Sequence, residues 1–480
     1  MKVVICNPPW PGKGVGARSN VRWPHRRGDK VLAFPIYLAY SSALLKKEGF
    51  DVTAFDAVEK DNGIFKFVNE VKKLAPDIII MEISAPSLNY DLETAFNLKK
   101  EIKGCLIVFC GPHLNYAHKD LIDNYKFVDI CIRGEFEHTI LDICKAVKEE
   151  RDFSAVKGIT YRTKNGETRI NPARELIDDL DKLPFPDRES FMIENYQQAF
   201  YGGKKTALMI SSRGCPYYCD FCLWPDTFLG HKHRQRSVKN TVDEIEYLIK
   251  NHGIDEVFFD DDTFAINKER MKEISREIIE RNIKISWVCM GRVNLIDKET
   301  VKVMKKAGCT QIFYGFESGS KDILNSIKKG ITLEDSLNAV KATQKCGLAA
   351  TGSFIIGLPK ENARTIKETI RFAVKLGADF VQFTLAAPFP GTRYWEEAKQ
   401  KNLLELNSLQ DLDGCSGPIV HTENLTKEEL AGWQRKAYIR YYTHPKIIWK
   451  SISRVRNLRE LRRILKGSRS VLARIFFYKE

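Results

Sequence analysis

Three cysteines stand close together near the middle of the 480-residue chain. Cys215, Cys219 and Cys222 have the spacing C-x3-C-x2-C, whereas the other nine of the twelve cysteines are scattered singly. Thiolates at this spacing can converge within one loop and bind an iron–sulfur cluster. A closed structural zinc site needs a fourth ligand, and His231 and His233 are the nearest candidates for it. The spacing therefore favours a [4Fe–4S] cluster with one iron left open, and a Cys3His zinc site is the alternative.

The cysteines follow the first apolar segment of a long alternation of strands and helices. Six β/α units of this kind predict a partial TIM-type (β/α)6 barrel over residues 201–395, with its active site at the carboxyl ends of the strands. The cysteines then stand at the end of the first strand. We expect the strands at residues 207–211, 256–260, 284–288, 311–315, 352–356 and 380–385, and helices between them such as 242–251, 269–282 and 365–377.

The first 150 residues also alternate short apolar runs with helical patterns. This alternation predicts a doubly wound, Rossmann-like α/β domain over residues 1–150, whose ligands lie at the carboxyl ends of its strands. Residues 151–200 break the pattern and form a linker, in which Asn165-Gly166 predicts a small hairpin. The expected strands of the N-terminal domain are residues 3–6, 52–55, 77–81, 106–110 and 128–132.

Most of the positive charge lies at the C-terminal end. Of the net charge of +14, residues 445–480 contribute +9, from eleven Lys and Arg against two Glu. Within a helical region at 396–480, apolar residues recur at helical spacing among these charges. They predict a basic amphipathic helix that either lies on an anionic membrane or packs on the barrel with its basic face in water. Because the charge is confined there, we do not expect a nucleic-acid partner.

No secretory signal and no apolar stretch of about 18 residues is present. We therefore expect a cytoplasmic protein, with peripheral contact to the inner face of the membrane through the basic helix.

The cysteine spacing at the first strand of a six-unit barrel, with the aromatic Phe221 before the last cysteine, resembles the radical S-adenosylmethionine (SAM) superfamily. In that superfamily SAM binds the open iron through its amino and carboxylate groups. An electron from the cluster then cleaves SAM to a 5′-deoxyadenosyl radical, which abstracts hydrogen from the substrate. The resemblance implies an enzyme, a [4Fe–4S] cluster, SAM and an external electron donor of the flavodoxin or ferredoxin type.

The resemblance also implies SAM contacts at the later strand ends. Asp261 and Asp262 follow the second strand, where the family holds the methionine amine, although they replace the usual Gly-Gly-Glu run. Arg292 follows the third strand and is expected to pair with the SAM carboxylate. Glu317, after the fourth strand, is expected to accept hydrogen bonds from the ribose or amine. Gly357, after the fifth strand, is expected to lie against the adenine.

The N-terminal domain resembles the cobalamin-binding domain of the B12-dependent branch of this superfamily. Ser87, after the third strand, and Gly111, after the fourth, stand where that domain contacts the corrin and its nucleotide tail. The loop after the first strand lacks an Asp-x-His-x-x-Gly motif, so cobalamin is expected to bind without histidine ligation. The alternative is a domain that packs on the barrel and binds no corrin.

The basic C-terminal region and the residues Cys222-Leu223-Trp224-Pro225 resemble the hopanoid-biosynthesis subgroup. We therefore expect the enzyme to methylate, rearrange or cyclise an unactivated carbon of a lipid-linked or secondary-metabolite substrate. Two other interpretations are a radical SAM enzyme that modifies RNA and a non-enzymatic iron–sulfur or corrinoid binding protein. The sequence assigns no catalytic residue beyond the cofactor sites.

Overall fold

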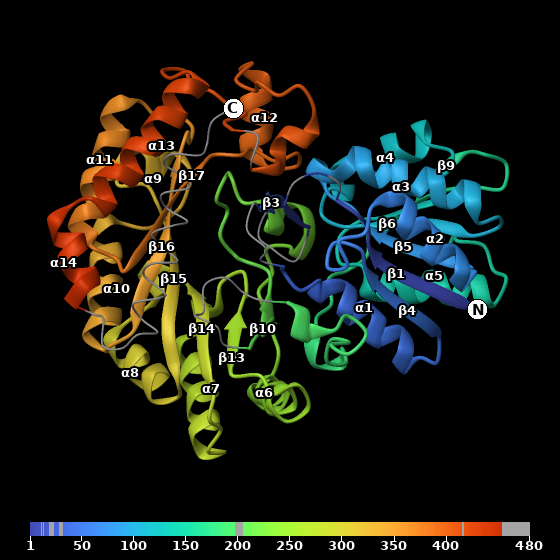
Figure 1. The fold of residues 1–480 in the computed structure, drawn as a ribbon, viewed down its shortest axis with the longest axis horizontal. Helices are drawn as coiled ribbons and strands as arrows, with labels where there is room; N and C mark the ends of the chain where they lie inside the picture. Colours follow the sequence, from blue (N-terminus) through green and yellow to red (C-terminus); the bar gives the residue numbers. More distant parts are fainter. Residues whose placement is uncertain are drawn as a thin grey trace.

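Two mainly parallel sheets flanked by helices form the protein. The computed structural model describes residues 1–10, 12, 14–18, 24–27, 32–196, 205–414 and 417–453. In Figure 1 the N-terminal sheet lies on the right and the barrel sheet on the left, with helices on the outer side of the barrel. The predicted α/β class, with a Rossmann-like domain before a partial barrel, is confirmed.

The N-terminal sheet has the strand order β4-β1-β5-β6-β7-β8-β9. Its first five strands in this order are parallel, as predicted. Ile78 to Glu82 are buried throughout, as expected for a central strand with helices on both faces. The parallel strands are β1 (Lys2–Asn7), β4 (Asp51–Asp56), β5 (Ile78–Glu82), β6 (Leu106–Cys110) and β7 (Ile130–Ile132).

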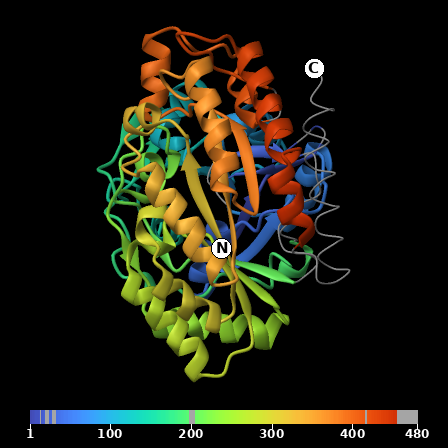
Figure 2. The same ribbon diagram turned by 90° about the vertical axis from the view of Figure 1, so that its left-hand side faces the viewer.

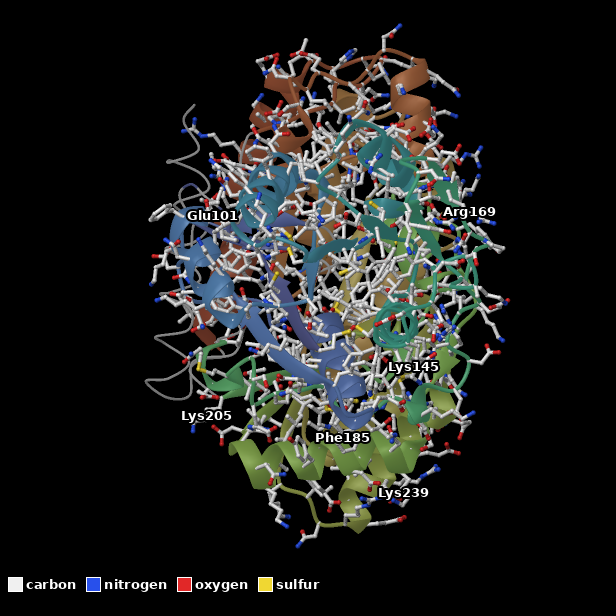
Figure 3. All side chains as sticks on the ribbon, turned by 90° about the vertical axis from the view of Figure 1, so that its right-hand side faces the viewer. Glu101, Lys145, Arg169, Phe185, Lys205 and Lys239 are labelled. Atoms are coloured by element: carbon white, nitrogen blue, oxygen red, sulfur yellow. The ribbon has the colours of Figure 1, made fainter. Side chains whose placement is uncertain are left out.

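The predicted hairpin is present as β8 (Ile159–Arg162) and β9 (Thr168–Ile170). It pairs antiparallel with β7, so this part of the 151–200 segment extends the N-terminal sheet. In Figure 3, Glu101 at the end of α3 (Leu88–Glu101) and Arg169 on β9 lie at opposite margins of the N-terminal domain.

The helices divide between the two faces of the N-terminal sheet. On one face, α2 (Ile64–Leu74), α3 and α4 (Leu114–Asn124) enclose a separate apolar cluster. On the other face, α1 (Ile36–Lys47) and α5 (Glu137–Lys148) belong to an apolar core that continues into the barrel. The two domains therefore share one core, and this contact fixes their relative placement.

The barrel sheet runs β10-β13-β14-β15-β16-β17 with all pairs parallel. Strands β10 and β17 form its two edges, so the barrel is partial, as predicted. The strands are β10 (Thr206–Met209), β13 (Glu256–Phe259), β14 (Ser286–Gly291), β15 (Cys309–Glu317), β16 (Ala349–Ile356) and β17 (Phe380–Leu385). The helices between them are α6 (Val238–His252), α7 (Lys268–Glu280), α8 (Lys298–Lys306), α9 (Lys321–Ser326), α10 (Leu333–Lys345) and α11 (Ala363–Leu376).

Three helices follow the barrel: α12 (Arg393–Gln400), α13 (Lys427–Tyr442) and α14 (Pro445–Ser453). Helix α13 packs on β17, where the Tyr438 hydroxyl lies 3.1 Å from the Phe383 nitrogen. Figure 2 shows α13 and α14 along the outside of the barrel. Most of the predicted basic helix, residues 454–480, lies outside the described part of the chain. Among the described helices, none has the length and apolar character needed to cross a membrane.

Candidate active site

A small antiparallel pair of strands brackets the cysteine loop. Strand β11 (Ser212–Arg213) pairs with β12 (Arg234–Gln235), and residues 214–233 between them carry the three cysteines. Gly214 has φ +82°, and a Cβ there would lie 2.3 Å from the carbonyl oxygen of Lys232. Only glycine permits this close approach at the start of the loop. Cys219 is buried, whereas Cys215 and Cys222 are partly exposed.

The two histidines near this loop are directed to other partners. His231 Nδ1 lies 3.1 Å from the Cys215 carbonyl oxygen, and its Nε2 lies 2.9 Å from Asp226 Oδ1. His233 Nδ1 lies 3.1 Å from the Gly214 carbonyl oxygen, and its Nε2 lies 2.9 Å from Gln235 Nε2. With both ring nitrogens of each histidine engaged, the donor set of the loop is three thiols, which disfavours the Cys3His zinc alternative.

The described residues contain no set of three His, Cys, Asp or Glu side chains that converge as ligands of a single metal ion. In a [4Fe–4S] cluster each thiolate binds a different iron, so the sulfurs stand farther apart than the ligands of one zinc ion. Three thiols in one loop match the protein ligands that such a cluster needs.

Two cations lie close to Cys219. Burial raises the pKa of the Cys219 thiol, and the charges of Lys329 and Arg292 act to lower it. Lys329 pairs with Glu317 at 2.6 Å, and both side chains are nearly buried. The Arg292 guanidinium lies 3.6 Å from the centre of the Tyr217 ring. Because a cluster bound by three thiolates is negatively charged, these cations fit its environment.

Three residues that are predicted to contact SAM lie at the carboxyl ends of the neighbouring strands β14, β15 and β16. They are Arg292, Glu317 and Gly357. Arg292 is buried, and its Nε has no hydrogen-bond partner within the described residues, which fits an incoming carboxylate. Glu317 ends β15 with φ +58°, a strained conformation for a residue other than glycine. The Gly357 nitrogen donates to Glu361 Oε2 at 2.6 Å, and the Tyr394 hydroxyl donates to the Gly357 carbonyl at 2.5 Å. Direct contact of these residues with SAM stays a prediction.

Asp261 and Asp262 hold the start of the cysteine loop. Asp261 is buried and accepts hydrogen bonds from the Ser211 nitrogen and from the hydroxyls of Ser211 and Ser212, at 2.6–2.7 Å. Asp262 accepts from the Gly214 nitrogen at 2.8 Å. These bonds explain why the sequence has acids at this strand end, because they fix the backbone that leads to Cys215. Contact of Asp261 and Asp262 with the methionine amine of SAM stays a prediction.

At the carboxyl edge of the N-terminal sheet, Ser87 and Gly111 lie at neighbouring strand ends. The Ser87 hydroxyl donates to Asp91 at 2.6 Å, and Asp91 pairs with Arg18 at 2.6 Å. Gly111 has φ +122°, and a Cβ there would lie 2.5 Å from the Ile83 carbonyl oxygen. The ends of β5 and β6 therefore approach backbone to backbone.

The N-terminal edge and the cysteine loop face one another. Helix α4, which follows Gly111, lies against residues Pro225–Leu229, which follow Cys222. Tyr116 on α4 also meets Trp395 on α12, with their ring centres 6.4 Å apart. The two predicted cofactor sites are thus parts of one region between the domains.

Two parts of the chain match known protein families. Residues 209–373 match the radical SAM superfamily, and residues 30–143 match the B12 binding domain. An uncharacterised methyltransferase of Pyrococcus horikoshii is 35% identical over 419 residues, which cover 87% of this chain and 90% of that protein. The chain belongs to the radical SAM superfamily and carries a B12-binding domain.

Other relatives of this radical SAM chain are named for different activities. An anaerobic magnesium-protoporphyrin IX monomethyl ester cyclase of Rubrivivax gelatinosus is 27% identical, covering 92% of this chain and 77% of that protein. A hopanoid C-3 methylase of Methylococcus capsulatus is 25% identical, covering 83% and 77%. The predicted resemblance to hopanoid-type enzymes is thus confirmed as a relationship, and cyclases and other methyltransferases share it.

A solved structure has the same fold as this radical SAM chain. The cobalamin-dependent SAM radical enzyme OxsB, with aqua-cobalamin and SAM bound, superposes with a TM-score of 0.74 at 18% identity, covering 99% of this chain and 72% of that one. This agreement confirms the fold, and the matches to the radical SAM and B12-binding families support the predicted cofactors, a [4Fe–4S] cluster, SAM and cobalamin. The matches support an enzyme over a non-catalytic binding protein and over RNA modification.

The corrin side of the site also includes His113, because the segment Gly111-Pro112-His113 follows the fourth strand, where contact with the corrin and its nucleotide tail is expected. His113 is buried, and its Nε2 has no hydrogen-bond partner among the described residues. Burial lowers the pKa of His113 to about 4, so the ring is neutral at physiological pH. A neutral imidazole beside Gly111 whose Nε2 has no partner among the described residues fits a polar cofactor at this edge. The sequence places His113 two residues after Gly111, but burial is what singles it out.

Arg18 is another functional candidate whose role the sequence did not reveal. The structure buries Arg18 against Asp91, Asn7 and the carbonyl of Pro8. Arg18 and Asp91 are 73 positions apart. No local pattern in the sequence could pair them.

We predict that Gly111→Ala weakens cobalamin binding. The added Cβ meets the Ile83 carbonyl and the backbone is strained, which together cost about 1–3 kcal/mol, so affinity should fall by about fivefold or more. The measurement is a titration of the purified chain with cobalamin, followed by absorbance. The control is Gly104→Ala, because Gly104 has a similar positive φ of +79° but open space around it. Equal affinities of the two variants would contradict the prediction.

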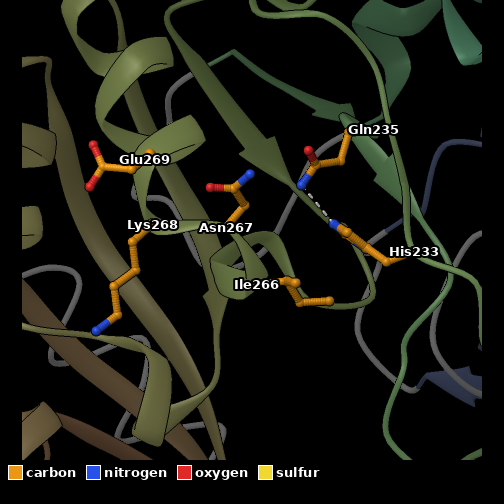
Figure 4. A pocket seen from close by; sticks show the side chains of 6 residues that line it. All are labelled: His233, Gln235, Ile266, Asn267, Lys268 and Glu269. Atoms are coloured by element: carbon orange, nitrogen blue, oxygen red, sulfur yellow. Dashed lines mark hydrogen bonds between the residues drawn. The ribbon is translucent and has the colours of Figure 1, made fainter.

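An open cavity lies beside the cysteine loop. Its volume is about 520 Å³, and Figure 4 shows the lining side chains around it. His233, on one wall, contacts the residue that precedes Cys215. The lining residues are His233, Gln235, Ile266, Asn267, Lys268 and Glu269. The cavity therefore gives solvent access close to the loop.

Proposed function

We propose that this radical SAM enzyme methylates, rearranges or cyclises an unactivated carbon of a lipid-linked or secondary-metabolite substrate. The observation that carries this proposal is the contact between α4, after Gly111, and residues Pro225–Leu229, after Cys222. It brings the edge expected to hold cobalamin to the loop expected to hold the cluster. A substrate between the two domains would reach both cofactors.

The chain's own residues bind and orient in this proposal. When bound, the cluster and SAM supply a carbon-centred radical, and cobalamin supplies methyl transfer. Arg292 and Lys329 place positive charge beside Cys219. Helix α12 follows the barrel directly and contacts the N-terminal domain through Trp395, so it helps to exclude water from the region between the domains.

The test is anaerobic purification of the full chain with iron, sulfide and cobalamin. The absorbance spectrum should show both cluster and corrin, and dithionite with SAM should yield 5′-deoxyadenosine. SAM carrying a deuterated methyl group should transfer that label to the corrin if methylation is the activity. A spectrum with cluster but no corrin would exclude cobalamin-dependent methylation. Absence of 5′-deoxyadenosine would refute the radical-enzyme proposal.

We propose that the cavity beside the cysteine loop receives the external electron donor. Flavodoxins and ferredoxins are usually acidic, so Lys268 on its wall is expected to contribute to docking. Lys268→Glu should slow reduction of the cluster by a flavodoxin several-fold and leave reduction by dithionite unchanged. The control is Lys119→Glu, since Lys119 is likewise an exposed lysine paired with an aspartate, but on the N-terminal domain. Equal rates for both variants would exclude this docking position.

We propose peripheral membrane contact through α14. Trp449 is 74% exposed and Ile452 is 61% exposed, and this helix begins the segment with the surplus of +9 charges. Exposed aromatic and aliphatic side chains with basic neighbours favour an anionic lipid surface. Trp449→Ser should reduce co-sedimentation with vesicles containing anionic lipid, with Phe65→Ser on the N-terminal domain as the control. Binding that is equal for neutral and anionic vesicles, or unaffected by Trp449→Ser, would contradict it.

A further inference from the structure

Four charged side chains form a buried cluster between the two domains. Glu135 lies just before α5, and Glu137 is the first residue of that helix. Arg213 donates to Glu135 at 3.0 Å and to Glu137 at 2.6 Å. Arg234 donates to Glu135 at 2.7 Å. We call these four residues the interdomain ion cluster, because the glutamates belong to the N-terminal domain and the arginines to the barrel.

The interdomain ion cluster is fully desolvated. Each of its four side chains is at most 2% exposed, and its two positive charges balance its two negative charges. A buried charge that loses its partner costs several kcal/mol of free energy. An arrangement of the two domains that separated these pairs would therefore be unfavourable. Burial acts to lower the pKa of Arg213, but the attraction of Glu137 and Glu135 raises it overall. The guanidinium therefore stays charged.

Its arginines stand at the two ends of the cysteine loop. Arg213 is two residues before Cys215, and Arg234 is paired with Arg213 across β11 and β12. The rings of Tyr37 and Tyr40, on α1, also pack on the Arg213 guanidinium at 5.2 Å. Both ends of the loop are thus attached to the N-terminal domain through charged side chains, in addition to the apolar core.

A second buried ion cluster provides a comparison. Glu244 on α6 accepts from Arg188 at 2.9 Å and from Arg236, and all three side chains are nearly inaccessible. Arg236 lies next to β12, and Arg188 lies in the segment before the barrel. This second cluster includes no residue of α5. It therefore resembles the interdomain ion cluster in burial and in its pairing of arginine with glutamate, although it has two arginines and one glutamate, and it does not connect α5 to the cysteine loop.

We propose that the interdomain ion cluster is a positioning device that fixes the cysteine loop relative to the N-terminal domain, and with it the separation of the iron–sulfur cluster from the corrin. Its four members are positioning residues, since none is expected to touch the cofactors. The part of the proposal that concerns the separation of the two cofactors rests on the proposed function, because it assumes that both are bound. The part that concerns the fixed position of the cysteine loop does not depend on the cofactors.

The first test uses the full chain without cofactors. Glu137→Gln keeps the size of the side chain and removes its charge, and Glu244→Gln does the same in the second cluster. Hydrogen exchange of the amides at 214–223 should become at least about tenfold faster in Glu137→Gln than in the unsubstituted chain, because the loop loses its attachment. It should change little in Glu244→Gln. Unchanged exchange in Glu137→Gln, or equal acceleration in both variants, would overturn the proposal.

Arg234→Lys is the second variant, because it keeps the positive charge and guards against a folding defect in Glu137→Gln. A lysine has one nitrogen and cannot reproduce the forked contacts of Arg234, whose Nη1 donates to Glu135 and the Ile177 carbonyl while its Nη2 donates to the Leu229 carbonyl. It should accelerate exchange at 214–223 less than Glu137→Gln does. Exchange equal to that of the unsubstituted chain in both variants would overturn the proposal.

The second test measures the separation of the two cofactors without turnover. With cobalamin in its Co(II) form and the cluster reduced, both centres are paramagnetic, and their magnetic interaction depends steeply on distance. The electron paramagnetic resonance spectrum should change in Glu137→Gln and stay unchanged in Glu244→Gln. An unchanged spectrum in Glu137→Gln would refute the positioning of the cofactors. If the unsubstituted chain binds no cluster or no corrin, the proposed function fails, and the exchange result still decides whether the loop is fixed.

Discussion

Cys219→Ser is expected to abolish both the iron–sulfur cluster and SAM cleavage. Cys219 is the buried member of the three cysteines and has Lys329 and Arg292 beside it. Loss of one thiolate leaves two protein ligands for a cluster that needs three, and a serine hydroxyl is a poor replacement for a soft sulfur. Substitution of residues that only support the ligands of a metal site typically lowers metal affinity or activity by about 10–100-fold. Loss of a ligand itself should therefore lower the formation of 5′-deoxyadenosine by more than about 100-fold.

The measurement is the iron content and visible spectrum after anaerobic reconstitution, followed by quantification of 5′-deoxyadenosine. The matched control is Cys346→Ser, because Cys346 is a free, partly exposed cysteine far from the loop in sequence. It should retain about four iron atoms per chain and full SAM cleavage. A Cys219→Ser variant that keeps the cluster spectrum would show that Cys219 is not a ligand.

The stability of the protein is expected to fall as the pH rises toward 8, because of Glu361. Burial raises the pKa of this carboxyl from 4.5 to about 8, although hydrogen bonds from the Gly357 and Leu358 nitrogens act to lower it. The folded chain therefore retains a proton that the unfolded chain releases. Its stabilising effect is complete below pH 4.5 and is lost as the pH passes through about 8. The shift corresponds to about 5 kcal/mol.

The comparison with Glu361→Gln isolates this effect, because glutamine keeps the shape of the side chain without its ionisation. The free energy of unfolding of each protein should be measured by denaturant titration between about pH 5 and pH 9. The difference between the two should shift in favour of Glu361→Gln by several kcal/mol across this range. A difference that stays constant with pH would show that Glu361 is ionised in the folded chain.

The positions of the central strands along the chain were predictable from the sequence because these strands are short apolar runs, buried on both faces. Val3 to Cys6 and Ile78 to Met81 show this pattern, and both lie in the N-terminal sheet as expected. The hairpin at Asn165-Gly166 was also predictable from its turn residues. Its pairing with β7 was not, since the pattern of a hairpin does not specify the strand it joins.

The cysteine ligands could be predicted because three residues within one loop form a local pattern. The charges around them could not. Lys329 contacts Glu317 across 12 positions, and Arg213 contacts Glu135 across 78. Such pairs form only when the chain is folded, so neither periodicity nor spacing shows them. For the same reason the sequence could not show that Asp261 supports Ser211 and Ser212.

The apolar core shared by α1, α5 and the barrel has a consequence for how this enzyme can diversify. If the two domains were separated, each would expose the apolar surface that now forms the shared core. Neither domain is therefore expected to stay soluble when it is produced alone. A corrin domain taken from a relative would have to bring matching α1 and α5 faces with it. New substrates are therefore easier to accommodate by substitution of barrel side chains that are not part of this common interior than by exchange of whole domains.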